Sequence, residues 1–240
     1  MAADDKVALV TGASRGIGRA IALALGREGF RLALVARTGP ELDEVARELE
    51  SDGGEALSLA CDVTDPEAVA LAVRRAVERF SRLDVLVNNA GVVEGQGFRD
   101  VQVEEIGRVL DVTLRGTIVA TRHALPYLLQ HAEGAAVVNV GSLAGRQALR
   151  GAAVYSAAKH GVLGFADSLF ENVRETGLKV CTILPGFVDT PRVSDATELE
   201  RSRMISPEDV ADAVLWALGA SPRTCPTEIV LRPQRSPFRA

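Results

Sequence analysis

Short runs of apolar residues alternate along this chain with longer stretches in which apolar positions recur every three or four residues. Seven short runs are β-branched or leucine-rich: residues 7–10, 31–35, 56–60, 85–87, 136–140, 179–184 and 228–231. Most are apolar throughout, which predicts strands buried on both faces. The stretches between them are long enough for helices that cross from one strand to the next. The pattern therefore predicts an α/β fold with a doubly wound, seven-stranded parallel sheet and helices on both faces.

Capping residues and proline mark the starts of two of the helices. The segments 64–67 (Thr-Asp-Pro-Glu) and 206–209 (Ser-Pro-Glu-Asp) both have the residue types of a helix N-terminus. Three stretches are less regular, namely residues 92–100, residues 189–203 and the tail from Pro233. The second follows a predicted strand near the candidate site, and we expect it to act as a lid.

Composition and charge indicate one folded domain over residues 1–240. Hydrophobic residues make up 47% of the chain and charged residues 25%, and α/β chains of this length usually form one domain. The formal net charge is −5 and the basic residues are scattered, so we expect no nucleic-acid partner. The start is short and polar, and no run approaches the roughly 18 uninterrupted apolar residues of a membrane span. We therefore expect a cytoplasmic protein without a membrane partner.

The first apolar run leads directly into a glycine-rich turn and then a helical pattern. The turn has the sequence TGASRGIG over residues 11–18. A strand, a glycine turn and a helix in this order let the backbone approach a pyrophosphate, which binds the free N–H groups of the helix N-terminus. This arrangement is typical of a Rossmann-type dinucleotide site, although its spacing is G-x-x-x-G-x-G and an ordinary turn would also explain one or two of the glycines. The candidate cofactor-binding residues of the turn are Gly12, Ser14, Arg15, Gly16, Ile17 and Gly18.

The end of the second run bears on the choice of dinucleotide. An acidic residue there would bond the ribose 2′-OH and repel a 2′-phosphate, but this chain has Ala36 and Arg37. Arg37, together with Arg15 of the glycine turn, can make charge-assisted hydrogen bonds to that phosphate. The sequence therefore favours NADP(H) over NAD(H), although either arginine alone is also compatible with a solvated surface charge.

Tyr155 and Lys159 lie four residues apart in a predicted helix, so their side chains share one face. A nearby ammonium lowers the pKa of a phenol from its usual value near 10, which makes Tyr155 a usable proton donor or acceptor. Ser142 comes after the fifth run, at the edge where open α/β sheets bind ligands. A tyrosine and a lysine one turn apart also occur by chance, and a serine at such a place can simply cap a turn.

In order and spacing, these motifs resemble the short-chain dehydrogenase/reductase family, and in particular its 3-oxoacyl reductase-like members. The resemblance rests on segment 11–18, on segment 88–91 (NNAG), on Ser142, Tyr155 and Lys159, and on segment 185–190 (PGFVDT). It implies an oxidoreductase in which Tyr155 protonates a carbonyl oxygen while the nicotinamide delivers hydride, or the reverse. Ser142 would hold that oxygen, and Lys159 would bind the nicotinamide ribose and depress the pKa of Tyr155.

The same resemblance implies further cofactor contacts and an assembly. The residues concerned are Asp62 and Val63 beside the adenine, Asn89, Ala90 and Gly91 beside the glycine turn, Val188 and Thr190 beside the nicotinamide carboxamide, and Pro185 and Gly186 in the same segment. The family likeness also suggests a homodimer or homotetramer, paired through helices in residues 103–130 and 152–175 and through the last strand.

One position departs from the family pattern. In segment 111–116 (DVTLRG) the family usually carries an asparagine that anchors a water next to the lysine, and this chain has Thr113. A hydroxyl is shorter than an amide and cannot present the same carbonyl. Proton relay through Lys159 could therefore be slower, rerouted or lost, and we include Thr113 among the candidate catalytic residues.

Other classes of function lack their motifs. Ser142 lies in VGSLA, without the first glycine of a nucleophile elbow, and no Gly-Lys-Ser/Thr closes the glycine turn. The three histidines form no close cluster and the three cysteines have no CxxC spacing, so we assign no metal and expect reduced thiols. The alternative that stays open is a catalytically weakened NADPH-binding sensor or interaction module. Because segment 189–203 has few large apolar side chains, we expect a small or polar carbonyl substrate. The family likeness implies a ketone, an aldehyde or a 3-oxoacyl group.

Overall fold

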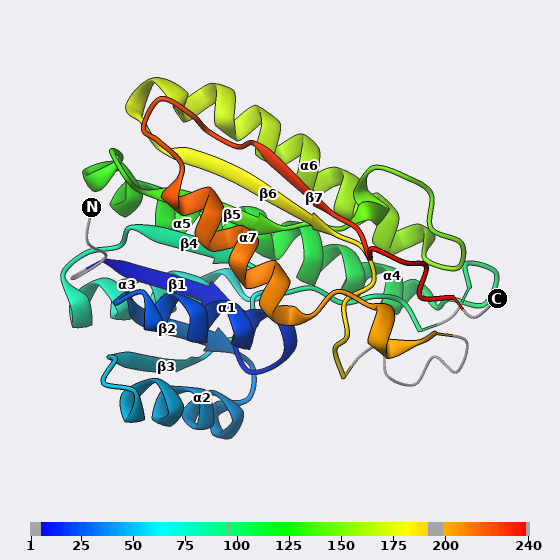
Figure 1. Ribbon diagram of the computed structural model, residues 1–240, viewed down its shortest axis with the longest axis horizontal. Coiled ribbons are helices and arrows are strands. Elements are labelled where there is room, and N and C mark those ends of the chain that lie inside the picture. Colours follow the sequence, from blue (N-terminus) through cyan, green and yellow to red (C-terminus); the bar gives the residue numbers. More distant parts are fainter. Residues whose placement is uncertain (1–5, 96, 192–198, 239–240) are drawn as a thin grey trace.

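A computed structural model describes residues 6–95, 97–191 and 199–238 of the chain. Its seven strands form one sheet in the order β3-β2-β1-β4-β5-β6-β7, and every neighbouring pair is parallel (Figure 1). The strands are β1 (Val7–Thr11), β2 (Arg31–Ala36), β3 (Ala56–Ala60), β4 (Val85–Asn88), β5 (Ala136–Val140), β6 (Lys179–Pro185) and β7 (Glu228–Leu231). Each apolar run of the sequence forms a strand within one residue of its predicted ends. The predicted doubly wound parallel sheet is confirmed.

Helices cover both faces of this sheet. The first face carries α1 (Gly16–Arg27), α2 (Gly39–Ser51) and α7 (Pro207–Gly219). The opposite face carries α3 (Pro66–Phe80), α5 (Gly116–Leu128) and α6 (Ala153–Val173). The short α4 (Val103–Leu110) packs against the beginning of α6. None of the helices in the described ranges is long and apolar enough to cross a membrane.

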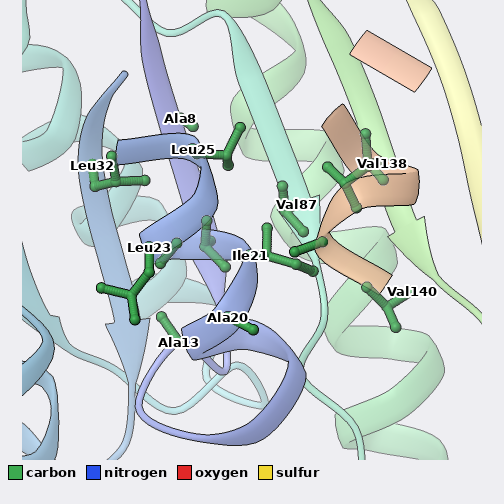
Figure 2. Packing of buried hydrophobic residues seen from close by; sticks show 14 of the residues in the cluster. Ala8, Ala13, Ala20, Ile21, Leu23, Leu25, Leu32, Val87, Val138 and Val140 are labelled. Atoms are coloured by element: carbon green, nitrogen blue, oxygen red, sulfur yellow. The ribbon is translucent and has the colours of Figure 1, made fainter. Parts of the chain in front are cut away.

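The core on the first face is built around α1. Figure 2 shows Ile21 and Leu25 of this helix packed among strand side chains that include Ala8, Val87 and Val138, and all five residues are fully buried. Burial of a side chain as large as leucine or isoleucine stabilises the fold by about 1.5–3 kcal/mol. This packing fixes α1, and with it the glycine turn at its N-terminus, against the middle of the sheet.

Both predicted helix starts are confirmed. The Asp65 side chain accepts hydrogen bonds from the N–H groups of Glu67 (2.9 Å) and Ala68 (3.2 Å) at the start of α3. Ser206 and Asp209 form a reciprocal capping box at the start of α7. These caps satisfy N–H groups that a helix N-terminus would otherwise leave unpaired.

The predicted lid is described only at its two ends, since residues 192–198 lie outside the described residues. The C-terminal tail contacts the second of these ends and Phe187, which precedes the first. Phe238 forms an antiparallel bridge with Leu199, and its ring meets that of Phe187 edge to face, with the centroids 5.3 Å apart. The tail therefore covers the segment that leaves β6, on the side of the molecule where α4 also lies (Figure 1).

The strand order reverses between β1 and β4. The chain runs from β1 outward through β2 to β3, returns to β4 on the other side of β1, and continues outward to β7. Such a reversal opens a crevice at the carboxyl ends of the two strands, which is where doubly wound sheets bind their ligands. The glycine turn and the segment 88–91 both begin at this point.

Candidate functional site

The glycine turn leads from β1 into α1 in a conformation that depends on its glycines. Gly12 and Gly16 have φ values of 66° and 55°, which glycine adopts without strain. At Gly18, a Cβ would lie 2.2 Å from the carbonyl oxygen of Gly12. Among the described residues, no side chain caps α1, and its first turn holds no acidic residue. The N–H groups and the positive end of this helix are therefore suited to an anion such as a pyrophosphate.

The segment after β4 is hydrogen-bonded to the glycine turn. The Asn89 side-chain amide donates to the carbonyl oxygens of Thr11 (2.9 Å) and Gly12 (3.1 Å). The Thr11 hydroxyl in turn accepts from the backbone N–H groups of Asn89 (3.0 Å) and Ala90 (3.1 Å). These bonds fix the turn against the end of β4.

Tyr155 and Lys159 lie on the first turns of α6, and the Lys159 Nζ is 5.7 Å from the centroid of the Tyr155 ring. Lys159 is only 5% exposed, and its ammonium donates to the carbonyl oxygen of Val140 at 2.5 Å. Val140 is the last residue of β5, so the ammonium is held at the carboxyl edge of the sheet. A cation this close to a phenol favours the phenolate.

Ser142 begins a short 3-10 turn, Leu143–Gly145, directly after β5. Its Oγ accepts a hydrogen bond from the Ala144 N–H at 3.1 Å, so this serine does cap a turn. Because the oxygen is the acceptor in that bond, the hydroxyl hydrogen is not consumed by it. The turn packs closely on α6, since a Cβ at Gly145 would lie 2.8 Å from the carbonyl oxygen of Lys159.

Thr113 lies in a π-helical turn, Asp111–Arg115, between α4 and α5. Its buried hydroxyl accepts from the Val92 N–H at 3.1 Å and donates to the Val92 carbonyl oxygen at 3.2 Å. A Cβ added to Gly91 would lie 3.6 Å from the Thr113 Oγ1 and 3.8 Å from the Lys159 Nζ. The π-helical turn, the segment after β4 and α6 thus meet at Gly91.

Glu94 lies in the same region and is not among the site residues that the sequence predicts. Its buried carboxylate accepts hydrogen bonds from the backbone N–H groups of Val154 (2.8 Å) and Tyr155 (3.0 Å). A carboxylate at a helix N-terminus satisfies unpaired donors and interacts favourably with the positive end of the helix. No local pattern reveals this cap, because 60 positions separate Glu94 from Val154.

Residues that leave β6 approach the glycine turn from the other side. A Cβ at Gly16 would lie 3.4 Å from the Thr190 Cγ2. The Gly186 N–H donates to the Leu231 carbonyl oxygen at 2.9 Å, directly after Pro185 ends the strand. Val188 is buried. The structure therefore brings Thr190 to the glycine turn, whereas the Val188 side chain packs into the core.

The residues predicted to lie near the adenosine part of the cofactor are Arg37, Asp62 and Val63. Arg37 is exposed, and we find no ion pair for it in the described part of the chain. The Asp62 Oδ1 accepts from the backbone N–H (2.9 Å) and the hydroxyl (2.8 Å) of Thr64, so this oxygen is engaged locally. Val63 is buried, and a Cβ at Gly116 would lie 3.0 Å from its Cγ2. Asp62 and Val63 thus follow β3 closely and are held by contacts with Thr64 and Gly116.

In the part of the chain that the structure describes, the remaining histidines, cysteines and acidic residues form no metal site. Within residues 6–95, 97–191 and 199–238, no group of histidine, cysteine, aspartate or glutamate could hold a metal ion. Burial raises the pKa of Cys181 to about 12 and that of Cys61 to about 11. Both side chains are therefore neutral thiols near pH 7 and poor nucleophiles.

Known proteins resemble this chain over almost its whole length. The family model described as short chain dehydrogenase matches residues 6–201. An uncharacterized oxidoreductase of Staphylococcus aureus strain USA300 is 35% identical over 229 residues, which cover 95% of this chain and 97% of that protein.

Solved structures of short-chain oxidoreductases and dehydrogenases are also similar to this chain. A metagenomic short-chain oxidoreductase in complex with NADP has 32% sequence identity and a TM-score of 0.85, covering 98% of this chain and 100% of that chain. A short chain dehydrogenase from Burkholderia cenocepacia J2315 in complex with NADP has 30% identity and a TM-score of 0.88, with 97% of each chain covered.

Proposed function

Because the chain belongs to the short-chain dehydrogenase family, we propose that it is an NADP(H)-dependent oxidoreductase that interconverts a carbonyl and an alcohol. The observation that carries this proposal is the approach of Tyr155 to the buried ammonium of Lys159, at the edge of the sheet where Ser142 begins its turn. A phenol beside a fixed cation is suited to give and take a proton near neutral pH.

The glycine turn fits a dinucleotide. Gly12 and Gly18 leave no room for a Cβ, and the uncapped start of α1 supplies N–H groups for a pyrophosphate. Two structurally similar proteins were solved in complex with NADP, and the exposed Arg15 and Arg37 add positive charge next to the turn. These observations support NADP(H) as the cofactor, held by the residues that the sequence predicts.

The proposed reaction assigns a distinct part to each of three residues, Tyr155, Ser142 and Lys159. When bound, the nicotinamide supplies or accepts the hydride. Tyr155 gives its hydroxyl proton to the carbonyl oxygen in reduction and takes it back in oxidation. The Ser142 hydroxyl donates a hydrogen bond to the same oxygen, while its Oγ keeps the bond from Ala144. Lys159 stabilises the phenolate that remains after proton transfer and would bind the nicotinamide ribose.

The described ends of the lid support a small or polar carbonyl substrate. Arg201 pairs with Asp189 at 2.6 Å and Arg203 with Glu200 at 2.8 Å, so both ends present charged groups.

We also propose a homodimer or homotetramer, as the family likeness suggests. Trp216 on α7 and Val230 on the edge strand β7 are exposed apolar side chains that such an interface would bury.

A pair of tyrosine variants tests the proposed chemistry. Tyr155→Phe removes one hydroxyl, and Tyr127→Phe makes the same change in α5, where the half-buried ring packs against the core. We expect Tyr155→Phe to lower kcat for carbonyl reduction by about 10²- to 10⁴-fold, because general acid catalysis is lost. NADPH binding, measured by fluorescence titration, should stay unchanged, and Tyr127→Phe should retain turnover. Full activity of Tyr155→Phe, or an equal loss in both variants, contradicts the proposal.

A further inference from the structure

Glu41 places a carboxylate next to the glycine turn. It lies in the first turn of α2, and the hydroxyl of Thr38 donates to its Oε2 at 2.7 Å. The hydroxyl of Thr38, which is bonded to the carboxylate, the nearby hydroxyl of Ser14 and the positive charge of Arg15 lower the pKa of Glu41. At neutral pH the side chain is therefore an anion held between two segments of the chain.

These two segments meet at the end of β2. Ser14 and Arg15 belong to the glycine turn, whereas Arg37 and Thr38 come directly after β2. A backbone hydrogen bond of 3.2 Å from the Ala13 N–H to the Val35 carbonyl oxygen joins the turn to the strand. The turn that carries Ser14 and Arg15 is thus joined to the strand end that Arg37 and Thr38 follow.

The two arginines at this place differ from their neighbour Arg19. Arg15 and Arg37 are exposed, and within the described ranges neither forms an ion pair. Arg19, one turn further along α1, is already paired with Glu48 of α2. Hydroxyl and guanidinium donors are the groups that bind phosphate oxygens in proteins. Glu41 therefore occupies the hydroxyl of Thr38, a donor that a phosphate could use.

We propose that Glu41 is an internal anion in the subsite for the 2′-phosphate of NADP(H), and that its carboxylate must leave the hydroxyl of Thr38 before this phosphate binds. The inference rests on the proposed function in one respect, namely that the chain binds a nicotinamide dinucleotide. A phosphate monoester carries a charge of about −1.5 to −2 near neutral pH, so the carboxylate both competes with it for donors and repels it. Glu41 thereby reduces the preference for NADP(H) over NAD(H) that Arg15 and Arg37 would give alone.

Substitution by glutamine separates the charge of Glu41 from its size. Glu41→Gln keeps an oxygen that can accept from Thr38 but carries no charge. Glu50→Gln makes the same change on the same helix, about 13 Å further along its axis, at another exposed glutamate. Dissociation constants for NADPH, NADH and 2′,5′-ADP are measured by titration calorimetry. The last ligand carries the 2′-phosphate without the nicotinamide.

Glu41→Gln should bind NADPH and 2′,5′-ADP about five- to tenfold more tightly than the wild type, the scale of one exposed like-charge contact. The constant for NADH should not change, and Glu50→Gln should match the wild type for all three ligands. Raising the salt concentration should shrink the difference, because salt screens exposed charges.

Three outcomes overturn the inference. In the first, 2′,5′-ADP binds the wild type and Glu41→Gln equally, or binds the variant less tightly. In the second, Glu41→Gln weakens only NADH binding, which would assign the carboxylate to the ribose hydroxyls of NAD(H). In the third, no dinucleotide binds the wild type or either variant, which overturns the proposed function as well. Dinucleotide binding with an unchanged constant for 2′,5′-ADP overturns the inference alone.

Discussion

Among the single side chains of the site, Thr113 is the one at which the sequence predicts a departure from the family pattern. The sequence predicts that a hydroxyl at this place weakens the proton relay, because it lacks the reach of an amide. In the structure, this hydroxyl satisfies both backbone groups of Val92, at 3.1 Å and 3.2 Å. The Thr113 carbonyl oxygen accepts from the hydroxyl of Thr117 at 3.0 Å. The threonine therefore holds the segment after β4 close to Lys159 by its own hydrogen bonds.

Thr113→Val preserves the shape of the side chain and removes its hydroxyl. The hydrogen bond from the half-buried Val92 N–H is then lost, which costs about 0.5–1.5 kcal/mol of unfolding free energy. We expect urea denaturation to show this loss and kcat for carbonyl reduction to fall with it. Thr113→Ser keeps the hydroxyl and should retain most of both quantities. Wild-type stability in Thr113→Val, or an equal loss in Thr113→Ser, would argue against this role.

Among the elements, α6 carries both Tyr155 and Lys159, and two contacts hold its beginning. Gly145 lets the Ser142 turn pack against the helix, and Glu94 caps its first turn from the segment after β4. The second contact connects the cofactor side of the site to the helix that bears the tyrosine. Glu94 is thus a positioning residue that acts through the backbone of Tyr155.

Glu94→Ala should lower the unfolding free energy by about 0.5–2 kcal/mol, the usual cost of a lost N-terminal cap. It should also lower kcat while leaving the KM for NADPH nearly unchanged, since the glycine turn keeps its bonds to Asn89. Glu94→Gln retains one carbonyl oxygen as an acceptor and should recover part of kcat.

Glu104→Ala, at an exposed glutamate in the first turn of α4, is the control and should leave kcat unchanged. Thermal unfolding and steady-state kinetics measure these effects. A Glu94→Ala enzyme with wild-type kcat would exclude the positioning role.

At the scale of the whole molecule, the fold depends on local patterns, whereas the detail of the site depends on contacts between distant segments. The seven strands are predicted within one residue because buried parallel strands are apolar along their whole length. The cap from Glu94 to α6 and the contact of Phe238 with Phe187 could not be predicted. Each needs side-chain positions that only the folded chain supplies, since no helical or strand periodicity relates the partners.

Hydride transfer to a carbonyl is tested most directly with NADPH that carries deuterium at C4 of the nicotinamide, prepared separately with the label on each face. The wild-type protein is incubated with ketones, aldehydes and an acetoacetyl thioester, and mass spectrometry tracks the label. We predict that one labelled form gives an alcohol with one deuterium at the former carbonyl carbon, in step with NADPH oxidation. Bound NADPH that passes no label to any carbonyl would contradict the proposed reaction and favour a nucleotide-binding module.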